Sequence, residues 1–251
     1  MVEILVLSLI QGITEFLPVS SSSHLIIYSE IKEFSARGLI LDVSLHIGSF
    51  LAVLIYFRKE LLSFMENRRL FTIVIFASIP ILVTGFVLAK TGIINDLRTL
   101  RIIGWTTIIF AIFLYISDKQ ETKLNIKENF TYKSGVLIGM MHILSLIPGV
   151  SRSGIAITSA RFLGFNRVDA TKISYYLSIP VLTAVSCFGL YENFFVSDNN
   201  LSKISYLGIM LSFLFSYITI KYFLIYIKKF NMNLFVLYRI FLGLIILFYA
   251  Y

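Results

Sequence analysis

Charged side chains are scarce in this chain of 251 residues: Asp, Glu, Lys and Arg make up 14% of it, whereas hydrophobic residues make up 57%. The mean hydropathy is +0.85. Since soluble domains carry about 25% charged residues, this composition excludes a soluble globular protein. Apolar runs close to the roughly 20 residues that cross a bilayer recur along the whole sequence. We therefore expect an all-α polytopic membrane protein.

Cysteine is almost absent as well. The single Cys187 excludes an internal disulfide and gives a thiolate metal site no second ligand. A basic N-terminal segment is also lacking, because Glu3 stands where a signal peptide would carry positive charge, and we expect this stretch to belong to the mature protein. The net charge of +8 is spread in short clusters between apolar runs. These clusters indicate membrane topology and no nucleic-acid partner.

The apolar runs divide into about six full spans and two interrupted segments. The spans are expected at residues 38–57, 70–89, 102–117, 173–191, 204–227 and 234–251. The interrupted segments, residues 2–28 and 134–163, contain Pro18 and Pro148, each followed by serines. Proline removes a backbone hydrogen bond, and hydroxyl groups offer the backbone other partners. Each segment is therefore expected to be a re-entrant helix, break and helix.

An interrupted segment followed by three spans occurs twice, at residues 1–117 and 134–251, with a loop at 118–133 between them. If both segments re-enter, most lysines and arginines collect on one side, including those at 58–59, 68–69 and 228–229. The positive-inside rule makes that side, with the loop, cytoplasmic and places both termini outside. The chain is then one integral membrane domain, an inverted-topology repeat whose breaks meet near the midplane.

The first interrupted segment carries reactive side chains. Gln11 and Glu15 are four residues apart, so on a helix they lie on one face and address one ligand, a metal ion or a substrate oxygen. After Pro18 the serine run offers hydroxyl groups and backbone N–H groups at a helix start, which suits a phosphate. The run comprises Ser20, Ser21, Ser22 and Ser23. His24 follows, a group that transfers a proton or attacks phosphorus near neutral pH.

The second interrupted segment supplies a fixed cation. Arg152 lies between Ser151 and Ser153, and its planar guanidinium matches two phosphate oxygens. Gly149 lets the backbone approach a ligand closely. The two segments thus predict two halves of one phosphate site, although Glu15 and Arg152 also have the simpler interpretation of a buried ion pair that joins the repeats.

Other polar residues in the apolar runs receive simpler interpretations. His46 and His142 have no acid nearby in the sequence, and we expect them to be packing residues. Asp42, at the start of the first full span, is compatible with a position at the membrane surface. Tyr175, Tyr176 and Tyr238 are expected to pack or to lie in an interfacial belt.

The strings TEFLPVSSSSH (residues 14–24) and PGVSRSG (148–154) resemble the undecaprenyl-diphosphate phosphatase family, the bacitracin-resistance type of membrane phosphatase. The resemblance extends through HIGSFLAV (46–53), RFLGFNR (161–167) and YYLSIPVL (175–182), and through IKYFLIYIKKF and YRI near the C-terminus. It implies hydrolysis of a polyprenyl diphosphate to the monophosphate and phosphate, which recycles the lipid carrier of cell-surface glycan synthesis. It also implies a divalent cation, Mg²⁺ or Ca²⁺, and a cavity that opens to the outer face of the plasma membrane.

By position, the resemblance makes Gln11 and Glu15 the cation-binding pair of the family, and Ser21 and His24 its essential serine and histidine. Ser151 and Arg152 match its second motif, so the expected catalytic residues are Glu15, Ser21, His24 and Arg152, and the remaining residues of both loops bind substrate. Three positions depart from the pattern: Gln11 is neutral where Glu is frequent, Ser23 replaces a glycine, and Ala156 replaces a threonine.

The nucleophile stays open among Ser21, His24 and a water activated by His24. Two other functions also stay open. One is a transporter or flippase for a polyprenyl phosphate or another anion, because broken helices at the midplane are also transporter architecture. The other is a non-catalytic lipid-binding protein. A homodimer is a further expectation.

Overall fold

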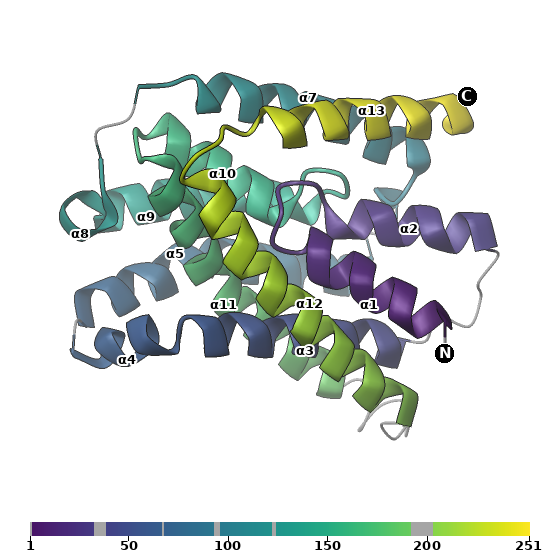
Figure 1. Ribbon diagram of the computed structural model, residues 1–251, viewed down its shortest axis with the longest axis horizontal. Helices are drawn as coiled ribbons and strands as arrows, with labels where there is room; N and C mark the ends of the chain where they lie inside the picture. Colours follow the sequence, from purple (N-terminus) through teal and green to yellow (C-terminus); the bar gives the residue numbers. More distant parts are fainter. Residues whose placement is uncertain (1, 33–38, 67, 93–95, 122–123, 192–202) are drawn as a thin grey trace.

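The computed structural model describes residues 2–32, 39–66, 68–92, 96–121, 124–191 and 203–251. This part of the chain is helical and contains no strand; one isolated bridge joins Leu124 to Phe165. The helices are α1 (Val2–Thr14), α2 (Ser21–Lys32), α3 (Leu39–Tyr56), α4 (Arg58–Glu66), α5 (Arg68–Thr91), α7 (Leu100–Asp118), α8 (Ile126–Asn129), α9 (Tyr132–His142), η1 (Ile143–Leu146), α10 (Arg152–Phe162), α11 (Arg167–Tyr191), α12 (Lys203–Ile227) and α13 (Asn233–Ala250) (Figure 1).

Five helices of the described part are long and apolar enough to cross a membrane: α5, α7, α11, α12 and α13. They correspond to five of the about six expected spans. The other expected span, residues 38–57, is α3, whose apolar part Leu41–Tyr56 is shorter. By length and composition, the described residues thus contain five candidate spans, and the chain is a multi-pass membrane protein.

Both interrupted segments are broken at the expected places. The first consists of α1 and α2 with a turn at residues 15–20, and the second of α9, the short η1 and α10 with a turn at 147–151. Each turn contains the proline that the sequence indicated, Pro18 or Pro148. The breaks are therefore confirmed.

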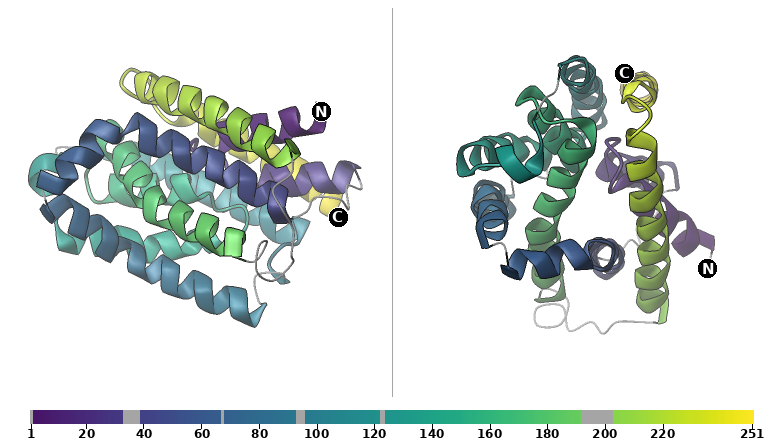
Figure 2. Two further views of the ribbon diagram at one scale, coloured as in Figure 1. Left: turned by 90° about the horizontal axis from the view of Figure 1, so that it is seen from below. Right: turned by 60° about the vertical axis from the view of Figure 1, so that its left-hand side comes forward.

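Helices from the first half of the chain pack mainly against helices from the second half. In Figure 1, α7 lies beside α13 and α12 crosses α3 obliquely, and both pairs are in extensive contact. The short helix α1 packs on α12, and the short helix α9 packs on α5. The two views in Figure 2 show the same interleaving. The broken segments are thus held by spans of the opposite half.

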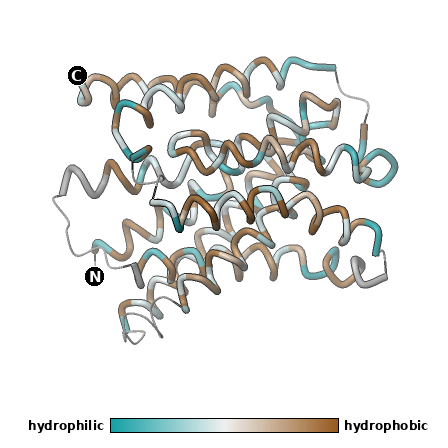
Figure 3. Tube along the Cα trace, turned by 180° about the vertical axis from the view of Figure 1, so that it is seen from behind, coloured by the Kyte–Doolittle hydropathy of each residue, from teal (hydrophilic) through white to brown (hydrophobic). Residues whose placement is uncertain are grey.

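The outer surface is apolar. Figure 3 shows hydrophobic residues along much of α13, and large side chains such as Phe241, Phe248 and Trp105 are exposed. Contiguous apolar surface of this kind is disfavoured in water and fits contact with lipid. Inside, hydroxyl groups link spans. Ser49 Oγ lies 3.2 Å from Ser212 Oγ, and the Ser212 hydroxyl donates to the Leu45 carbonyl at 2.7 Å. Small polar residues of this type are common at helix contacts in membranes.

Two glycines allow the short helices to approach the spans. A Cβ on Gly12 of α1 would collide with the Cβ of Phe215 on α12, and one on Gly139 of α9 would overlap the carbonyl of Ala77 on α5. Backbone contacts this close increase the dispersion energy between helices, which is the main attraction available in lipid. The close packing of α1 on α12 and of α9 on α5 therefore depends on the absence of a side chain at Gly12 and Gly139.

We expect Gly139→Ala to lower the free energy of unfolding by about 1–3 kcal/mol, because the added methyl group forces α9 away from α5. Thermal unfolding of the purified protein in detergent measures this loss. Gly85→Ala is the matched control on α5, since its Cβ would meet only the Leu146 side chain at 3.5 Å, an ordinary contact. Equal melting temperatures for the two variants would contradict the close-contact argument.

Candidate functional site

The two turns share an unusual backbone conformation. Ser20 and Ser151 have φ angles of 72° and 73°, and among the described residues they are the non-glycine positions with positive φ. Each precedes a helix, α2 or α10. Ser151 Oγ accepts a hydrogen bond from Gly154 N at 3.1 Å as the cap of α10, and Ser20 Oγ contacts Ser23 Oγ at 2.9 Å. Such conformations cost about 1–3 kcal/mol and concentrate at functional sites.

An ion pair joins the two turns. Arg152 Nη2 lies 2.7 Å from Glu15 Oε1, and both side chains are largely buried. Glu15 Oε2 accepts hydrogen bonds from Ser21 Oγ at 2.8 Å and from Gln11 Nε2 at 3.1 Å. The sequence therefore identified a group of residues that the fold does bring together. Arg152 Nη1 is buried without a hydrogen-bond partner in the described part of the chain, so this nitrogen has donor capacity that the protein leaves unused.

Gln11 connects this group to a residue that we expected only to pack. Its Nε2 lies 3.0 Å from His46 Nδ1 on α3, in addition to its bond to Glu15. An amide nitrogen carries two hydrogens, which suffices for one bond to each partner. His46 also lines the cavity described next. The interpretation of His46 as a packing residue was therefore wrong, because only the packing of α3 against α1 creates this contact.

A cavity of about 340 Å³ opens between the turns. Five residues of the predicted site line it: Glu15, Ser20, Ser21, Ser151 and Arg152. The lining also includes Asp42 and Arg98 and an apolar part that contains Val181 and Val185. This volume and mixture of charged and apolar walls suit a ligand with an anionic and a hydrocarbon part.

Several predicted substrate-binding residues instead hold the turns together. Ser153 Oγ donates to the Leu17 carbonyl at 2.7 Å, and Ser23 is fully buried against Ser20. Gly149 has a φ of 93°, and a Cβ there would collide with Thr106 Oγ1. These residues do not line the cavity. Their role is to shape the turns; the side chain of Ser22 lies outside the described residues.

His24 also lies outside the cavity lining. Its Nδ1 is 2.7 Å from the Ser20 carbonyl oxygen, and its Nε2 is hydrogen-bonded to the hydroxyl of Tyr238 on α13. A carbonyl only accepts, so Nδ1 carries the proton and Nε2 accepts from the phenol; this tautomer is inferred from the hydrogen-bond network. The two rings are parallel, with an interplanar angle of 3°. Tyr238, interpreted from the sequence as a packing or belt residue, thus orients His24.

Tyr175 fits its interpretation as a packing residue, since it is fully buried against the rings of Phe16 and Phe57. His142 is fully buried outside the cavity lining.

Arg239, the neighbour of Tyr238, was missed as a site residue. It is fully buried on α13 and donates to the carbonyls of Pro18 at 3.3 Å, of Gly149 at 2.9 Å and of Val150 at 3.0 Å. It also donates to the Thr107 carbonyl at 3.3 Å. One side chain thus binds both turns. The signal was present in the sequence, because an arginine within an apolar span is a candidate functional residue by itself.

The residues around Glu15 do not form a cage for a divalent cation. Within the described chain, no group of three His, Cys, Asp or Glu side chains is arranged to hold a metal ion. Both oxygens of Glu15 already face donors, one of them the Arg152 guanidinium. A cation placed there would be repelled by that charge. The predicted metal ligands Gln11 and Glu15 thus belong to a hydrogen-bond network in this arrangement, and the Mg²⁺ or Ca²⁺ stays a prediction.

We expect Arg239→Met to destabilise the protein by several kcal/mol, since each buried carbonyl left without a donor costs about 1–3 kcal/mol. Thermal unfolding in detergent measures this loss. Arg101→Met is the matched control, because Arg101 is exposed and donates to one carbonyl, that of Ala250, at 3.2 Å. We expect the control to stay within about 0.5 kcal/mol of the original protein. A similar small effect for Arg239→Met would show that the turns do not depend on this side chain.

The comparisons with known proteins show the family of this chain. The family model described as "Bacitracin resistance protein BacA" matches residues 4–245. A protein of Pelagibacter ubique named undecaprenyl-diphosphatase is 48% identical over 251 residues, which are 100% of this chain and 98% of the relative. Proteins of the same name from Jannaschia sp. and Saccharophagus degradans are 34% and 38% identical over 98% and 94% of this chain, and 97% and 93% of the relatives. The chain belongs to the BacA family of bacitracin resistance proteins.

Proposed function

We propose that this chain hydrolyses a polyprenyl diphosphate of the undecaprenyl type to the monophosphate and inorganic phosphate, and so recycles the lipid carrier of cell-surface glycan synthesis. The observation that carries the proposal is the contact of Glu15 with both Ser21 and Arg152 beside one cavity. These groups supply a base, a hydroxyl nucleophile and a phosphate-binding cation. The name of the relatives supports the substrate class.

The diphosphate binds between the starts of two helices. Helix α2 begins at Ser21 and α10 begins at Arg152, and both residues line the cavity. A helix start presents free N–H groups and the positive end of the helix dipole to an anion. Arg152 Nη1 adds a charged donor that the protein itself does not use in the described part of the chain. The apolar wall at Val181 and Val185 accepts the first part of the prenyl chain.

Ser21 attacks the terminal phosphorus. Its hydroxyl proton passes to Glu15 Oε2, 2.8 Å away, while a bond forms from Oγ to phosphorus and the bond from phosphorus to the bridging oxygen breaks. The polyprenyl monophosphate leaves with the electron pair and takes the proton from Glu15. Water then attacks the phosphoserine while Glu15 accepts a proton of that water, and the bond from phosphorus to Ser21 Oγ breaks. Glu15 returns the proton to Ser21 Oγ, and inorganic phosphate leaves. Arg152 stabilises the charge that develops on the transferred group.

The geometry favours Ser21 over the other two nucleophiles. His24 has both ring nitrogens engaged, one by the Ser20 carbonyl and one by Tyr238, and it does not line the cavity. Ser21 lines the cavity and already donates to the acid. No step of this mechanism passes through a divalent cation.

The lengths of the broken helices support re-entry. Helices α1 and α2 have 13 and 12 residues, and α9 and α10 have 11 residues each. At 1.5 Å per residue they measure about 16–20 Å, less than the roughly 30 Å of hydrocarbon. In the proposed topology both segments re-enter and α3, with 18 residues, crosses as a sixth span beside the five long helices. Both termini then lie outside, and the cavity opens to the outer face of the plasma membrane. The homodimer stays a prediction.

Transport of a polyprenyl phosphate is the second candidate. In its support, the broken segment of each half packs on a span of the other half, α1 on α12 and α9 on α5. This arrangement is expected of inverted repeats, which transporters use for alternating access. Phosphate release by the purified protein from a polyprenyl diphosphate distinguishes the two. Transfer of the lipid across a vesicle membrane without phosphate release would overturn the hydrolase.

We expect Ser21→Ala and Arg152→Ala each to lower phosphate release from polyprenyl diphosphate by about 10²–10⁴-fold, since one removes the nucleophile and the other the cation. Ser78→Ala is the control, because Ser78 is buried and donates only to its own helix, to the Val74 carbonyl. The control should keep its activity. Substantial activity in Arg152→Ala, with the protein folded in the membrane, would refute the assigned site.

His24 acts in this mechanism as a positioning residue, because it holds the carbonyl of Ser20 next to the nucleophile Ser21. We expect Tyr238→Phe to lower kcat about fivefold to tenfold with little change in KM, because one hydrogen bond of about 1 kcal/mol that orients His24 is lost. Tyr222→Phe, at an exposed tyrosine on α12, is the control. If Tyr238 acts through His24, the double variant Tyr238→Phe/His24→Ala is no slower than His24→Ala alone. Independent losses that multiply in the double variant would contradict this positioning role.

A further inference from the structure

A second cavity lies at the other end of α7. The first cavity reaches Arg98, just before α7 begins, whereas the second, of about 570 Å³, is lined by Asp118 and Lys119 where α7 ends. The 19 residues of α7 span about 28 Å. The two cavities therefore lie on opposite sides of the molecule, and the proposed mechanism does not use the second one.

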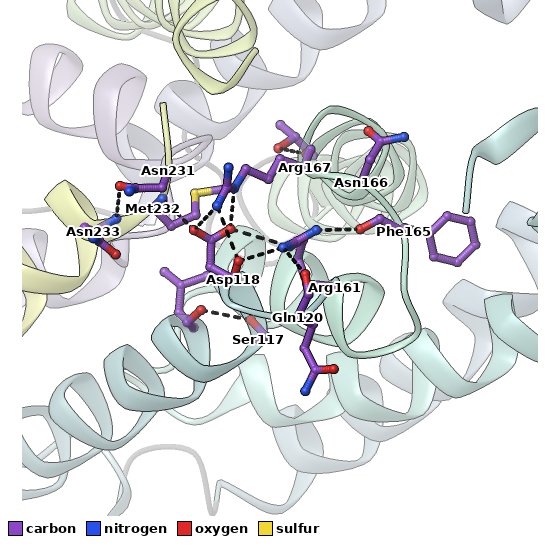
Figure 4. Close-up of polar contacts among 12 residues, drawn as sticks. Ser117, Asp118, Gln120, Arg161, Phe165, Asn166, Arg167, Asn231, Met232 and Asn233 are labelled. Atoms are coloured by element: carbon purple, nitrogen blue, oxygen red, sulfur yellow. Dashed lines mark hydrogen bonds and ion pairs between the residues drawn. The ribbon is translucent and has the colours of Figure 1, made fainter. Parts of the chain in front are cut away.

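The acid in this second cavity is neutralised by the protein. Asp118 accepts from Arg167 Nε at 2.6 Å and Nη2 at 3.0 Å, and from Met232 N at 3.0 Å (Figure 4). Arg161 is buried beside it and donates to the carbonyls of Asp118 at 2.7 Å and Gln120 at 3.1 Å, where α7 ends. This network is structural, since it joins the end of α7 to α10, α11 and the start of α13.

The remaining charges in the cavity are mainly positive. Lys119 and Lys228 are exposed and line it, and the bonds of Arg167 to Asp118 use Nε and Nη2, which leaves Nη1 for another partner. The other acid of the lining is Glu121. The lining thus carries four cationic side chains and two carboxylates, a formal net charge of +2. A cavity with this balance favours an anion.

An apolar groove adjoins the basic cavity. It has a volume of about 300 Å³ and runs between α7 and α13, lined by Ile112, Tyr115, Asn233, Val236, Leu237 and Ile240. Asn233 lines both spaces. Lys119 Nζ lies 4.3 Å from the centre of the Tyr115 ring, so a wall of the groove continues into a wall of the basic cavity. Leu237 is 66% exposed, which places the groove at the lipid-facing surface.

We propose that the basic cavity and the apolar groove together bind one anionic phospholipid, with its phosphate head group between Lys119, Lys228 and Arg167 and an acyl chain along α7 and α13. A charged cavity beside a hydrocarbon-sized groove matches the two parts of such a lipid, and basic pockets between helices bind anionic head groups. In the topology proposed above, this lipid belongs to the cytoplasmic leaflet. The inference does not rest on the hydrolase activity.

The test is native mass spectrometry of the purified protein, offered equal amounts of phosphatidylglycerol and phosphatidylcholine in detergent. We expect preferential retention of phosphatidylglycerol. Lys119→Gln/Lys228→Gln should weaken that binding about 30-fold, at roughly 1 kcal/mol for each lysine. The matched control Lys127→Gln/Lys133→Gln removes the same charge from exposed positions of α8 and α9 outside the cavity, and should bind as the original protein does.

Leu237→Trp fills the groove and should lower retention of phosphatidylglycerol without changing the binding of inorganic phosphate. Equal retention of the two lipids by the original protein, or an equal loss in both double variants, would overturn the proposal. The proposal would also be overturned if inorganic phosphate displaced the lipid and Leu237→Trp had no effect on lipid retention, because the site would then bind a free anion. No outcome depends on turnover, so a failure of the hydrolase proposal is recognised separately.

Discussion

The guanidinium of Arg239 holds together the parts of this protein on which the site depends. It is fully buried and donates to carbonyls of the first turn, at Pro18, and of the second, at Gly149 and Val150. Turn carbonyls inside a membrane protein have little water to bind, so they need protein donors, and a buried cation needs acceptors. The Arg239 guanidinium supplies the donors that the turn carbonyls need, and the carbonyls supply the acceptors that the guanidinium needs. Together with the ion pair of Glu15 with Arg152 and the bond from Ser153 to the Leu17 carbonyl, this side chain sets the distance between the two turns and therefore the cavity between them.

The strained backbone at Ser20 and Ser151 is explained by the position of both turns beside one cavity. Ser20 and Ser151 adopt left-handed conformations that a free peptide would avoid, and each turn directs a helix start toward the same cavity. The ion pair of Glu15 with Arg152 then spans the two turns without using the whole guanidinium. A buried pair contributes little net stability once desolvation is counted. Its value here is positional, since it keeps a carboxylate beside a hydroxyl and a cation beside a phosphate site.

The polar chemistry is divided between the two ends of the molecule. One end holds the cavity of Glu15 and Arg152, with the hydrolytic groups, and the other holds the network of Asp118, which closes the ends of several helices. Between them the helices meet through small residues and hydroxyl groups, as at Gly139 and Ser212. Close backbone contacts replace the hydrophobic effect that drives packing in water. This division leaves one end of the molecule for the proposed hydrolysis and the other for the proposed lipid site.

The sequence by itself determined the class of protein, both breaks and the residues around Glu15 and Arg152, because hydropathy, proline and an acid in an apolar run act locally and need no partner to be recognised. Only the tertiary structure decided the roles of His46, Tyr238 and Arg239. Each contacts residues far away in the chain: His46 reaches Gln11, Tyr238 reaches His24, and Arg239 reaches both turns. Such contacts depend on how α3 and α13 pack, and no periodicity or spacing within one segment encodes that packing.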